Sequence, residues 1–332
     1  MNIIITGGAG FLGKNLAKGL LQNPNLKQLL LVDVTDASKT LLDDLNDKRV
    51  QYLCLDLAQE GSFEKMMSAL SERSLHRELD CIYHLAAVVS GQAEAEFELG
   101  MRVNFDITRN LLEGCRLIYQ NMNKENKKPI KFIFSSSLAV FGGKLLPKQI
   151  NAMTATTPSS SYGTQKAMCE LLINDYSRKG FIDGLVLRLP TISVRPGKPN
   201  QAASSFVSGI IREPLKGEKA ICPVNTDLQV WISSPDTVIK NFIHALTLKT
   251  DGLTYRTINL PGITVSIEQM IVALKSKTNQ SIIDLIEHTP NEAIEKIVVS
   301  WPCDFDITSS LEQGFSQDKD IQSIIMQYMQ MN

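Results

Sequence analysis

A glycine-rich turn near the start of the chain constrains its fold more than any other feature. Thr6-Gly7-Gly8-Ala9-Gly10-Phe11-Leu12-Gly13 follows the apolar run Ile3–Ile5, and residues 14–21 have the pattern of a helix. Glycines allow a sharp turn and let a pyrophosphate approach the backbone, because no Cβ stands in the way. The N-terminus of the following helix would point at that pyrophosphate. The turn therefore predicts a unit that binds a dinucleotide; an ordinary turn with several glycines is the alternative.

Asp33 supports this interpretation and indicates which dinucleotide binds. It ends a second apolar run, Leu29–Val32, and lies 20 residues beyond Gly13. An acid at about this spacing accepts hydrogen bonds from the adenosine ribose. Its carboxylate would repel a 2′-phosphate, and no Arg or Lys follows until Lys39. The sequence thus favours NAD over NADP.

Composition argues against several classes of function. The 332 residues have a formal net charge of −1, which leaves no basic surface for nucleic acid or an anionic membrane. The four histidines lack metal-ligand spacing, and none of the six cysteines forms a Cys-x-x-Cys pair. We therefore expect no metal site and mostly buried free thiols. No signal-peptide pattern or transmembrane-length apolar stretch is present, so we expect a cytoplasmic protein.

Short apolar runs alternate with helical segments in the first half of the chain. The runs are rich in Ile, Leu and Val, as expected of strands buried on both faces. This pattern predicts the α/β class, with a Rossmann-type doubly wound parallel sheet. The predicted strands are Ile3–Thr6, Leu29–Asp33, Tyr52–Leu57, Cys81–Ala87, Lys131–Ser137 and Gly184–Leu189.

The second half of the chain changes character at Pro190. Residues 190–223 are rich in proline and show little periodicity, which is typical of a segment that builds a binding site. Ser234-Pro235-Asp236 has the pattern of a helix start and predicts a helix to Leu248. We expect residues 1–189 to form an NAD-binding domain to which residues 230–260 return. Residues 190–229 and 261–332 are then a smaller, partly interleaved substrate lobe.

Tyr162 and Lys166 are four residues apart near the start of a predicted helix, so both project from one face. A phenol with its ordinary pKa near 10 is a poor base at neutral pH, and a neighbouring ammonium is expected to lower that pKa. Tyr162 can then act as a general base, and Lys166 can hold the nicotinamide ribose. The same pattern on a bare helix would be a surface pair.

Three serines precede this pair at the carboxyl end of the predicted strand Lys131–Ser137. Ligands bind at that end of the strands in open parallel sheets. The hydroxyl of Ser137 can bind the reacting oxygen and share its proton with Tyr162. The alternative is a polar strand end that caps a turn.

These motifs, in this order, resemble the extended short-chain dehydrogenases/reductases, the NAD-dependent epimerase/dehydratase superfamily. The glycine turn, His84-Leu85-Ala86-Ala87, Asn104, the three serines and Tyr-x-x-x-Lys carry the resemblance, which covers about residues 1–260. It implies a catalytic Ser137–Tyr162–Lys166 triad with Asn104 in support, and it implies a homodimer. The expected NAD contacts are then Gly7, Gly10, Phe11, Leu12, Gly13, Asp33, Asp56, Leu57, Leu85, Ala86, Ala87, Asn104, Tyr162, Lys166 and Pro190.

Two departures from family patterns narrow the expected reaction. Dehydratases of the family carry Thr-Asp-Glu where this chain has Ser137, Leu138 and Ala139, which argues against dehydration. Nucleotide-sugar epimerases usually carry an Asn shortly after the sixth strand, and residues 187–193 lack it. A net dehydrogenase that releases NADH is favoured. A nucleotide-sugar epimerase that retains NAD stays an alternative, and so does a non-catalytic NAD-sensing regulator.

A closer resemblance, to D-erythronate dehydrogenases, supports the dehydrogenase. The segments that carry it are Arg188–Asn200, Ala202–Phe206, Gly209–Pro214, Val88–Gly91 and Trp231–Pro235. It implies oxidation of the 2-hydroxyl of D-erythronate, a four-carbon sugar acid, to 2-dehydro-D-erythronate. Arg195 and Arg212 can grip a carboxylate through paired hydrogen bonds. The other expected substrate contacts are Ser90, Ser137, Tyr162, Ser204 and Ser205, although each polar loop residue can instead serve only to stabilise its loop.

Overall fold

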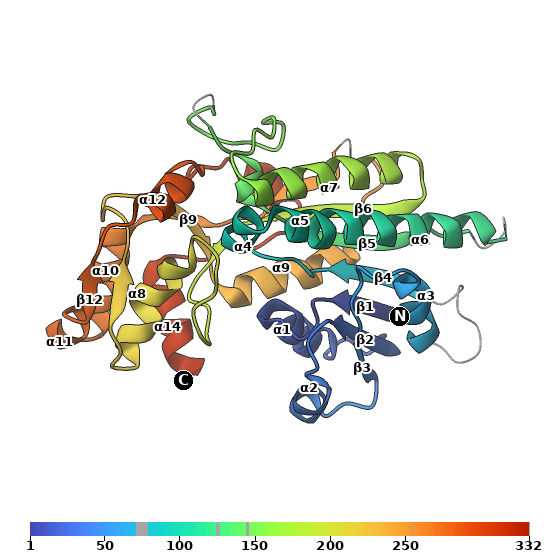
Figure 1. Ribbon diagram of the computed structural model, residues 1–332, viewed down its shortest axis with the longest axis horizontal. Helices are drawn as coiled ribbons and strands as arrows, with labels where there is room; N and C mark the ends of the chain where they lie inside the picture. The colour runs from blue at the N-terminus through green and yellow to red at the C-terminus, as the bar shows by residue number, and fades with distance from the viewer. Residues whose placement is uncertain (71–78, 124–126, 144–145, 254, 332) are drawn as a thin grey trace.

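The computed structural model describes residues 1–70, 79–123, 127–143, 146–253 and 255–331, which form two connected parts (Figure 1). In the described residues the larger part contains seven parallel strands in the order β10-β6-β5-β4-β1-β2-β3. The order reverses between β1 and β4, so the predicted doubly wound sheet is confirmed. The strands are β1 (Asn2–Thr6), β2 (Gln28–Asp33), β3 (Val50–Cys54), β4 (Leu79–His84), β5 (Ile130–Ser137), β6 (Ile182–Leu189) and β10 (Thr257–Asn259).

Helices cover both faces of this sheet, which explains why the strands are apolar throughout. Ile3 and Ile5 on β1 face one helical layer and pack with its Phe242, whereas Ile4 between them packs with Leu112 of the opposite layer. The first layer is formed by α1 (Phe11–Leu20), α2 (Ser38–Leu45) and α9 (Pro235–Thr247), and the second by α3 (Ser62–Leu70), α6 (Ile107–Asn121) and α7 (Ser161–Arg178).

Two strands end earlier than the sequence predicts. β3 ends at Cys54 and β4 at His84, each three residues before the expected end. In both cases one more backbone hydrogen bond to the neighbouring strand follows, from Leu55 N to Asp33 O and from Leu85 N to Thr6 O. The residues from there on line a cavity. Short helical elements connect the strands to the longer helices, namely α4 (Ser90–Ala95), α5 (Phe97–Gly100), the π-helical turn η1 (Met101–Asp106) and the 3₁₀ turn η3 (Leu138–Val140).

The smaller part packs around its own apolar core, which includes Phe206, Ile232 and Leu274. The predicted return segment 230–260 divides between the two parts: β9 lies in a small sheet, whereas α9 and β10 lie on the large one. The functional assignment of the two parts stays a prediction. The elements are β7 (Thr191–Ile192), β8 (Ala220–Cys222), β9 (Gln229–Ser233), β11 (Ile263–Ser266), β12 (Ile286–His288), α8 (Ser205–Leu215), α10 (Ile267–Lys277), α11 (Gln280–Ile283), α12 (Glu292–Val299), α13 (Thr308–Glu312) and α14 (Ile321–Met331).

The start of α9 is tied to the C-terminal segment through one buried carboxylate. Asp318 Oδ2 accepts hydrogen bonds from the Ser233 hydroxyl at 2.8 Å and from Ser234 N at 2.7 Å. Its Oδ1 accepts from the hydroxyls of Ser234 at 2.6 Å and Thr237 at 2.8 Å. A carboxylate at a helix N-terminus also meets the positive end of the helix dipole. The contact joins the small sheet, the large sheet's helical layer and the chain end.

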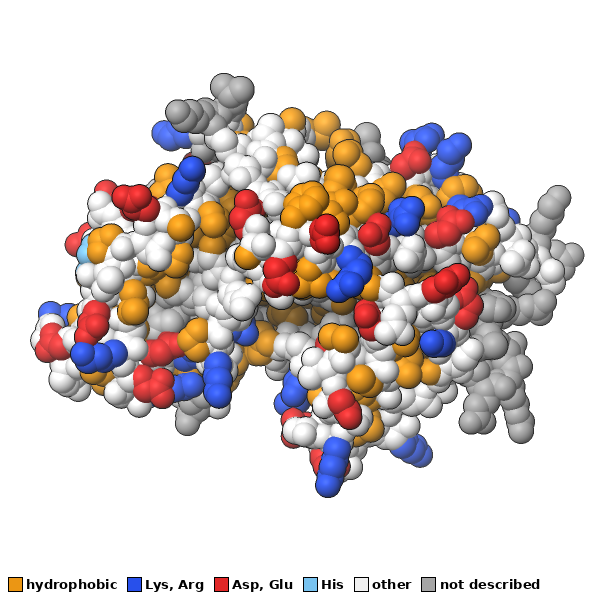
Figure 2. Space-filling view, viewed as in Figure 1, with side chains coloured by type: hydrophobic (Ala, Val, Ile, Leu, Met, Phe, Trp, Pro, Cys, Tyr) orange, Lys and Arg blue, Asp and Glu red, His pale blue; other side chains and the backbone are white. Residues whose placement is uncertain are grey.

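Hydrophobic side chains gather on the outer face of α6 and α7 (Figure 2). Leu117 and Leu171 are exposed there. The expected homodimer stays a prediction. No helix in the described part of the chain is long and apolar enough to cross a membrane.

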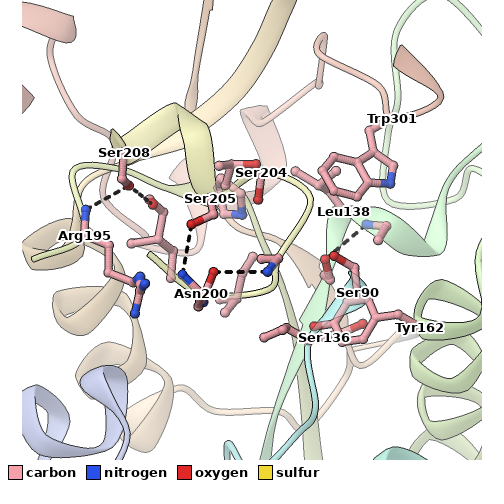
Figure 3. Close-up of a pocket in the computed structure, with 18 residues that line it drawn as sticks. Ser90, Ser136, Leu138, Tyr162, Arg195, Asn200, Ser204, Ser205, Ser208 and Trp301 are labelled. Atoms are coloured by element: carbon pink, nitrogen blue, oxygen red, sulfur yellow. Dashed lines mark hydrogen bonds between the residues drawn. The ribbon is translucent and has the colours of Figure 1, made fainter. Parts of the chain in front are cut away.

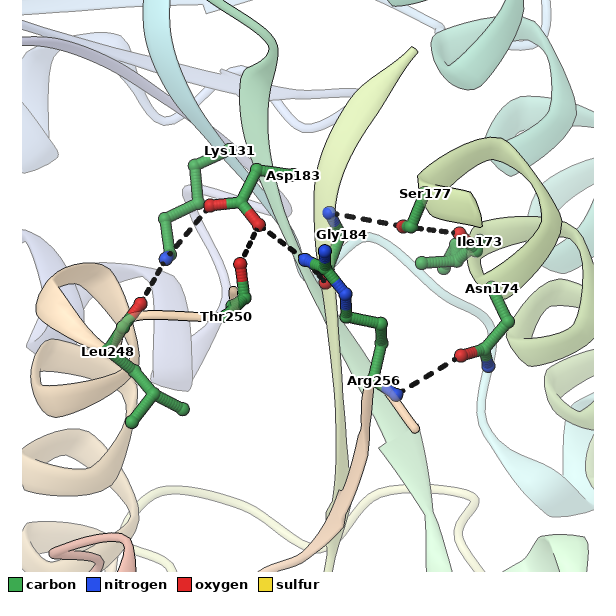
Figure 4. A network of polar contacts seen from close by, with 9 residues as sticks. All are labelled: Lys131, Ile173, Asn174, Ser177, Asp183, Gly184, Leu248, Thr250 and Arg256. Carbon is green, nitrogen blue, oxygen red and sulfur yellow. Dashed lines mark hydrogen bonds and ion pairs between the residues drawn. The ribbon is translucent and has the colours of Figure 1, made fainter. Parts of the chain in front are cut away.

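A polar network around Asp183 holds the amino-terminal ends of β5 and β6 to the chain that enters β10 (Figure 4). Asp183 pairs with Lys131 at 3.3 Å and with Arg256 at 2.6 Å, and it accepts a hydrogen bond from Thr250. Lys131 also donates to Leu248 O at 2.7 Å, just beyond α9. Burial acts to raise the pKa of Asp183, but the hydrogen bond from Thr250 and the two cations outweigh it and hold the pKa below its ordinary value.

We expect Asp183→Asn to destabilise the protein by about 1–3 kcal/mol at pH 7, because the variant loses charged hydrogen bonds. The pKa of Asp183 is lower in the folded state than in the unfolded state, so its contribution is present at neutral pH. That contribution is lost as the pH falls through the folded pKa. Urea unfolding at pH 7 and at pH 3 should therefore show a smaller difference from the wild type at pH 3. Asp251→Asn, at an exposed position, is the control, and an equal difference at both pH values would contradict the prediction.

Candidate active site

A cavity of about 430 Å³ lies at the carboxyl ends of β1 to β4, against the glycine turn. Asp33 is held at its edge by the backbone, because its carboxylate accepts hydrogen bonds from Ala9 N at 3.0 Å and from Thr35 N at 3.1 Å. The structure therefore brings the glycine turn and the acid together. The expected NAD contacts in the wall of this cavity are Gly7, Gly10, Asp33, Asp56, Leu57, Leu85, Ala86 and Ala87.

The glycine turn leaves no room for side chains. Gly7 has a φ of +72°, and a Cβ on it would lie 2.8 Å from Ala86 N. A Cβ on Gly13 would lie 2.3 Å from Gly7 O, so α1 packs directly on the turn. The N-cap of α1, Gly10, has no side-chain capping bond, which leaves the first N–H groups of the helix available to an anion. These residues fit a pyrophosphate. Phe11, Leu12 and Gly13 belong to α1 and do not line the cavity.

A second cavity, of about 190 Å³, adjoins Ser137 and Tyr162 (Figure 3). Ser137 ends β5, and its hydroxyl accepts a hydrogen bond from Ala139 N at 3.1 Å. Tyr162 lies in the first turn of α7, where a Cβ on Gly163 would lie 2.0 Å from Ala139 O. This close approach of α7 to η3 places the Tyr162 side chain in the wall of the same cavity as Ser137. Pro190 also lines this cavity.

Lys166 lies one turn after Tyr162 and is 1% exposed. Its ammonium donates to Ser135 O at 2.8 Å and lies 5.7 Å from the centre of the Tyr162 ring. On the next turn Glu170 accepts bidentate hydrogen bonds from Arg188, the shortest at 2.7 Å, and a further one from Ser136 at 2.5 Å. The predicted triad is thus assembled over a buried ion pair.

The acid–base properties of the triad differ from the expectation. Burial raises the pKa of Tyr162 to about 12, and the hydrogen bond with Ser137 acts in the opposite direction. Burial also lowers the pKa of Lys166 to about 8, against the opposing effects of Cys169 and Glu170. The expected lowering of the phenol pKa by Lys166 is therefore wrong for the protein alone. Desolvation outweighs the hydrogen bond with Ser137, which is the opposing effect on the phenol.

Asn104 lies in the π-helical turn η1 and connects two segments of the site. Its side chain accepts from Val88 N at 2.9 Å and donates to Val88 O at 3.2 Å and to Gln165 Oε1 at 2.8 Å. It thereby joins the loop after β4 to α7 between Tyr162 and Lys166. The neighbouring His84 is a structural residue: both ring nitrogens are occupied, by Thr6 and Thr108, and burial lowers its pKa to about 3.

The structure separates the two arginines that the sequence proposes as a carboxylate clamp. Arg195 is half-buried and lines the smaller cavity, with Nη2 donating to Lys198 O at 2.8 Å. Arg212 is 1% exposed and does not line that cavity. Its guanidinium pairs with Glu213 at 2.5 Å and donates to Arg195 O at 2.7 Å. Arg212 thus supports the backbone of Arg195 and faces a neighbouring cavity rather than this one. Its role in gripping the substrate stays a prediction.

Several wall residues lie outside the motifs. Ser90, Ser204 and Ser205 line the smaller cavity as expected, but Asn200, Ser208 and Trp301 also do so. Trp301 follows α12, far along the chain, so no local pattern could identify it. Arg102 lines the larger cavity. Its position in the same π-helical turn as Asn104 is the only local signal for it.

The chain is similar along its length to proteins of one known family. The sequence profile of the NAD dependent epimerase/dehydratase family matches residues 3–260. The chain belongs to this family. A D-erythronate dehydrogenase from Haemophilus influenzae is 49% identical over 333 residues, covering 99% of both chains. One from Cupriavidus necator is 43% identical over 340 residues, covering 99% of this chain and 98% of the relative.

Solved structures agree with this assignment. A nucleoside-diphosphate-sugar epimerase from Agrobacterium tumefaciens superimposes with a TM-score of 0.86 at 36% identity, covering 99% of this chain and 94% of its own. Family and relatives together identify the chain as an NAD-dependent oxidoreductase, as predicted, with NAD as its cofactor.

We expect Gly13→Ala to weaken NADH binding. The added Cβ would meet Gly7 O at 2.3 Å. Overpacking of this kind costs about 1–3 kcal/mol, so affinity should fall about tenfold or more. Gly209→Ala in α8 is the matched control, because its Cβ would stay 3.4 Å from the nearest atom, on the Glu213 side chain. Fluorescence titration with NADH measures both, and equal affinities would show that the turn tolerates a side chain.

Proposed function

We propose that the protein oxidises the 2-hydroxyl of D-erythronate, giving 2-dehydro-D-erythronate and NADH. Two observations support this proposal most strongly. The cavity beside Tyr162 is small and lined by hydroxyl groups. The chain is also 49% identical over its length to a D-erythronate dehydrogenase. Its volume of about 190 Å³ is below the roughly 300–1,000 Å³ of pockets for drug-sized ligands. That size suits a short acid better than a nucleotide sugar.

In the proposed mechanism, the C2 hydroxyl lies between Ser137 Oγ and the Tyr162 phenol. After Tyr162 has lost its own proton, its phenolate removes the hydroxyl proton, and the electron pair left on oxygen forms the carbonyl as the C2 hydride departs. Bound NAD⁺ supplies the acceptor for that hydride. Ser137 holds the reacting oxygen, and Lys166 stabilises the phenolate with its buried ammonium.

Charged residues at the two cavities suit the two ligands. Arg195 is the cation in the described wall of the smaller cavity, and we assign it to the substrate carboxylate. Arg102 is the cation in the described wall of the larger cavity, where it would pair with the cofactor pyrophosphate. Asp33 would accept hydrogen bonds from the adenosine ribose.

The first test is NADH formation from NAD⁺ and D-erythronate, with Tyr162→Phe beside the wild type. A general base contributes about 10²–10⁴-fold, so kcat should fall by that factor while NADH binding is retained. Normal turnover in Tyr162→Phe would contradict the assignment of the base. If the wild type forms no NADH but interconverts isomers of a nucleotide sugar, the chain is an epimerase instead.

Arg195→Gln should raise KM for the acid. A hydrogen bond to a charged group contributes about 1.5–3 kcal/mol, which corresponds to a rise of roughly 10- to 100-fold. KM for NAD⁺ should not change, because Arg195 lines the smaller cavity only. Arg178→Gln, at the exposed end of α7, is the control. Steady-state kinetics at varied acid concentration measures the effect, and an unchanged KM would place the carboxylate elsewhere.

A further inference from the structure

Two cavities meet at one loop of the smaller part. The substrate cavity of about 190 Å³ and a neighbouring cavity of about 520 Å³ share three wall residues, Asn200, Ala202 and Ser205. The neighbouring cavity continues along α8 past Arg212 and reaches residues 289–294. The loop 199–204 therefore stands between a small compartment next to Tyr162 and a larger compartment behind it.

The loop is folded tightly onto the start of α8 (Figure 3). Asn200 N donates to the Ser205 hydroxyl at 3.1 Å, and Asn200 Oδ1 accepts from Ala202 N at 3.1 Å. Ser205 N donates to Ala202 O at 2.9 Å. These bonds orient Asn200 and Ala202 as a wall that belongs to both compartments.

The loop is also held from the other side, by the first turn of α4. The buried Ser90 hydroxyl accepts a hydrogen bond from Ala203 N at 3.2 Å. A Cβ on Gly91 would lie 2.2 Å from Gln201 O, so the backbones of helix and loop touch at a place where only glycine fits. Ser90 is thus engaged with the loop, although the sequence proposes it as a substrate contact.

We propose that the loop 199–204 is a partition that sets the length of the acid accepted, and that Ser90 and Gly91 are the residues that hold it closed. This inference rests on the proposed function, since it assumes a sugar acid beside Tyr162. With the partition in place, carbons added beyond a four-carbon chain meet Asn200 and Ala202. With the partition displaced, they extend into the neighbouring compartment.

The test compares acids of increasing length, D-erythronate, D-ribonate and D-gluconate. Gly91→Ala should push Gln201 away and raise kcat/KM for D-ribonate and D-gluconate relative to D-erythronate. Discrimination by one added carbon is worth about 10–200-fold, so we expect the ratio to rise at least about tenfold. Ser90→Ala removes the acceptor for Ala203 N and should shift the ratio in the same direction. Ala95→Ser, which adds one atom to the exposed end of the same helix, should leave the ratio unchanged.

A binding measurement separates this proposal from the proposed function. Trp301 lines the substrate cavity, so quenching of its fluorescence reports acid binding in the presence of NADH without turnover. If the wild type binds D-erythronate without oxidising it, the proposed function fails, and the binding ratios still test the partition. Equal binding of all three acids by the wild type, or binding of none, would overturn the partition. An unchanged ratio in a Gly91→Ala or Ser90→Ala protein with wild-type NADH affinity would also overturn it.

Discussion

A buried ion pair behind the reacting centre determines where its charged groups can lie. Arg188 on β6 and Glu170 on α7 are 5% and 4% exposed and bond through two nitrogens. Lys166 lies one turn before Glu170, and Ser136 from β5 donates to the same carboxylate. Glu170 is the counter-charge of Arg188, and its charge also acts to raise the pKa of Lys166 against burial. It thereby joins α7, β5 and β6 at the carboxyl ends of the strands.

That arrangement has a consequence for the direction of catalysis. Burial favours the neutral forms of both Tyr162 and Lys166, because a low dielectric disfavours charge. The resting phenol therefore carries its proton at neutral pH. A protonated phenol is ready to donate to a ketone but must first lose a proton to oxidise an alcohol. In the proposed reaction the oxidative direction thus depends on positive charge near the phenol, and Lys166 with its pKa of about 8 is still mostly charged at pH 7.

The sequence predicts the fold, and it predicts that Ser137 and Tyr162 lie together at one cavity, because both depend on local patterns. Glycine spacing, Asp33 and the Tyr162–Lys166 pair follow from a turn or from one face of a helix, and the parallel sheet follows from apolar runs. Trp301 and Asn200 could not be predicted, because they reach the cavity only through the packing of the smaller part. Arg212 shows the same limit: its sequence neighbour Glu213 pairs with it, but only the fold shows that Arg212 is buried. The pKa of Tyr162 is raised rather than lowered because the side chain is buried, and burial depends on tertiary packing that the local sequence does not show.

The residues on α7 and the loops of the smaller part come from different regions of the chain and contribute different walls of the cavity beside Tyr162. Tyr162 and Lys166 lie on α7, against the large sheet, whereas the far wall of the cavity beside Tyr162 comes from loops of the smaller part. A change in those loops can reshape the cavity without moving Tyr162, because no strand of the large sheet includes them. This explains how a dehydrogenase and a protein named as a nucleoside-diphosphate-sugar epimerase can share one fold at 36% identity. In the proposed function, the reacting groups and the cofactor cavity stay with the large sheet, and the choice of substrate falls to segments of the smaller part such as 199–204.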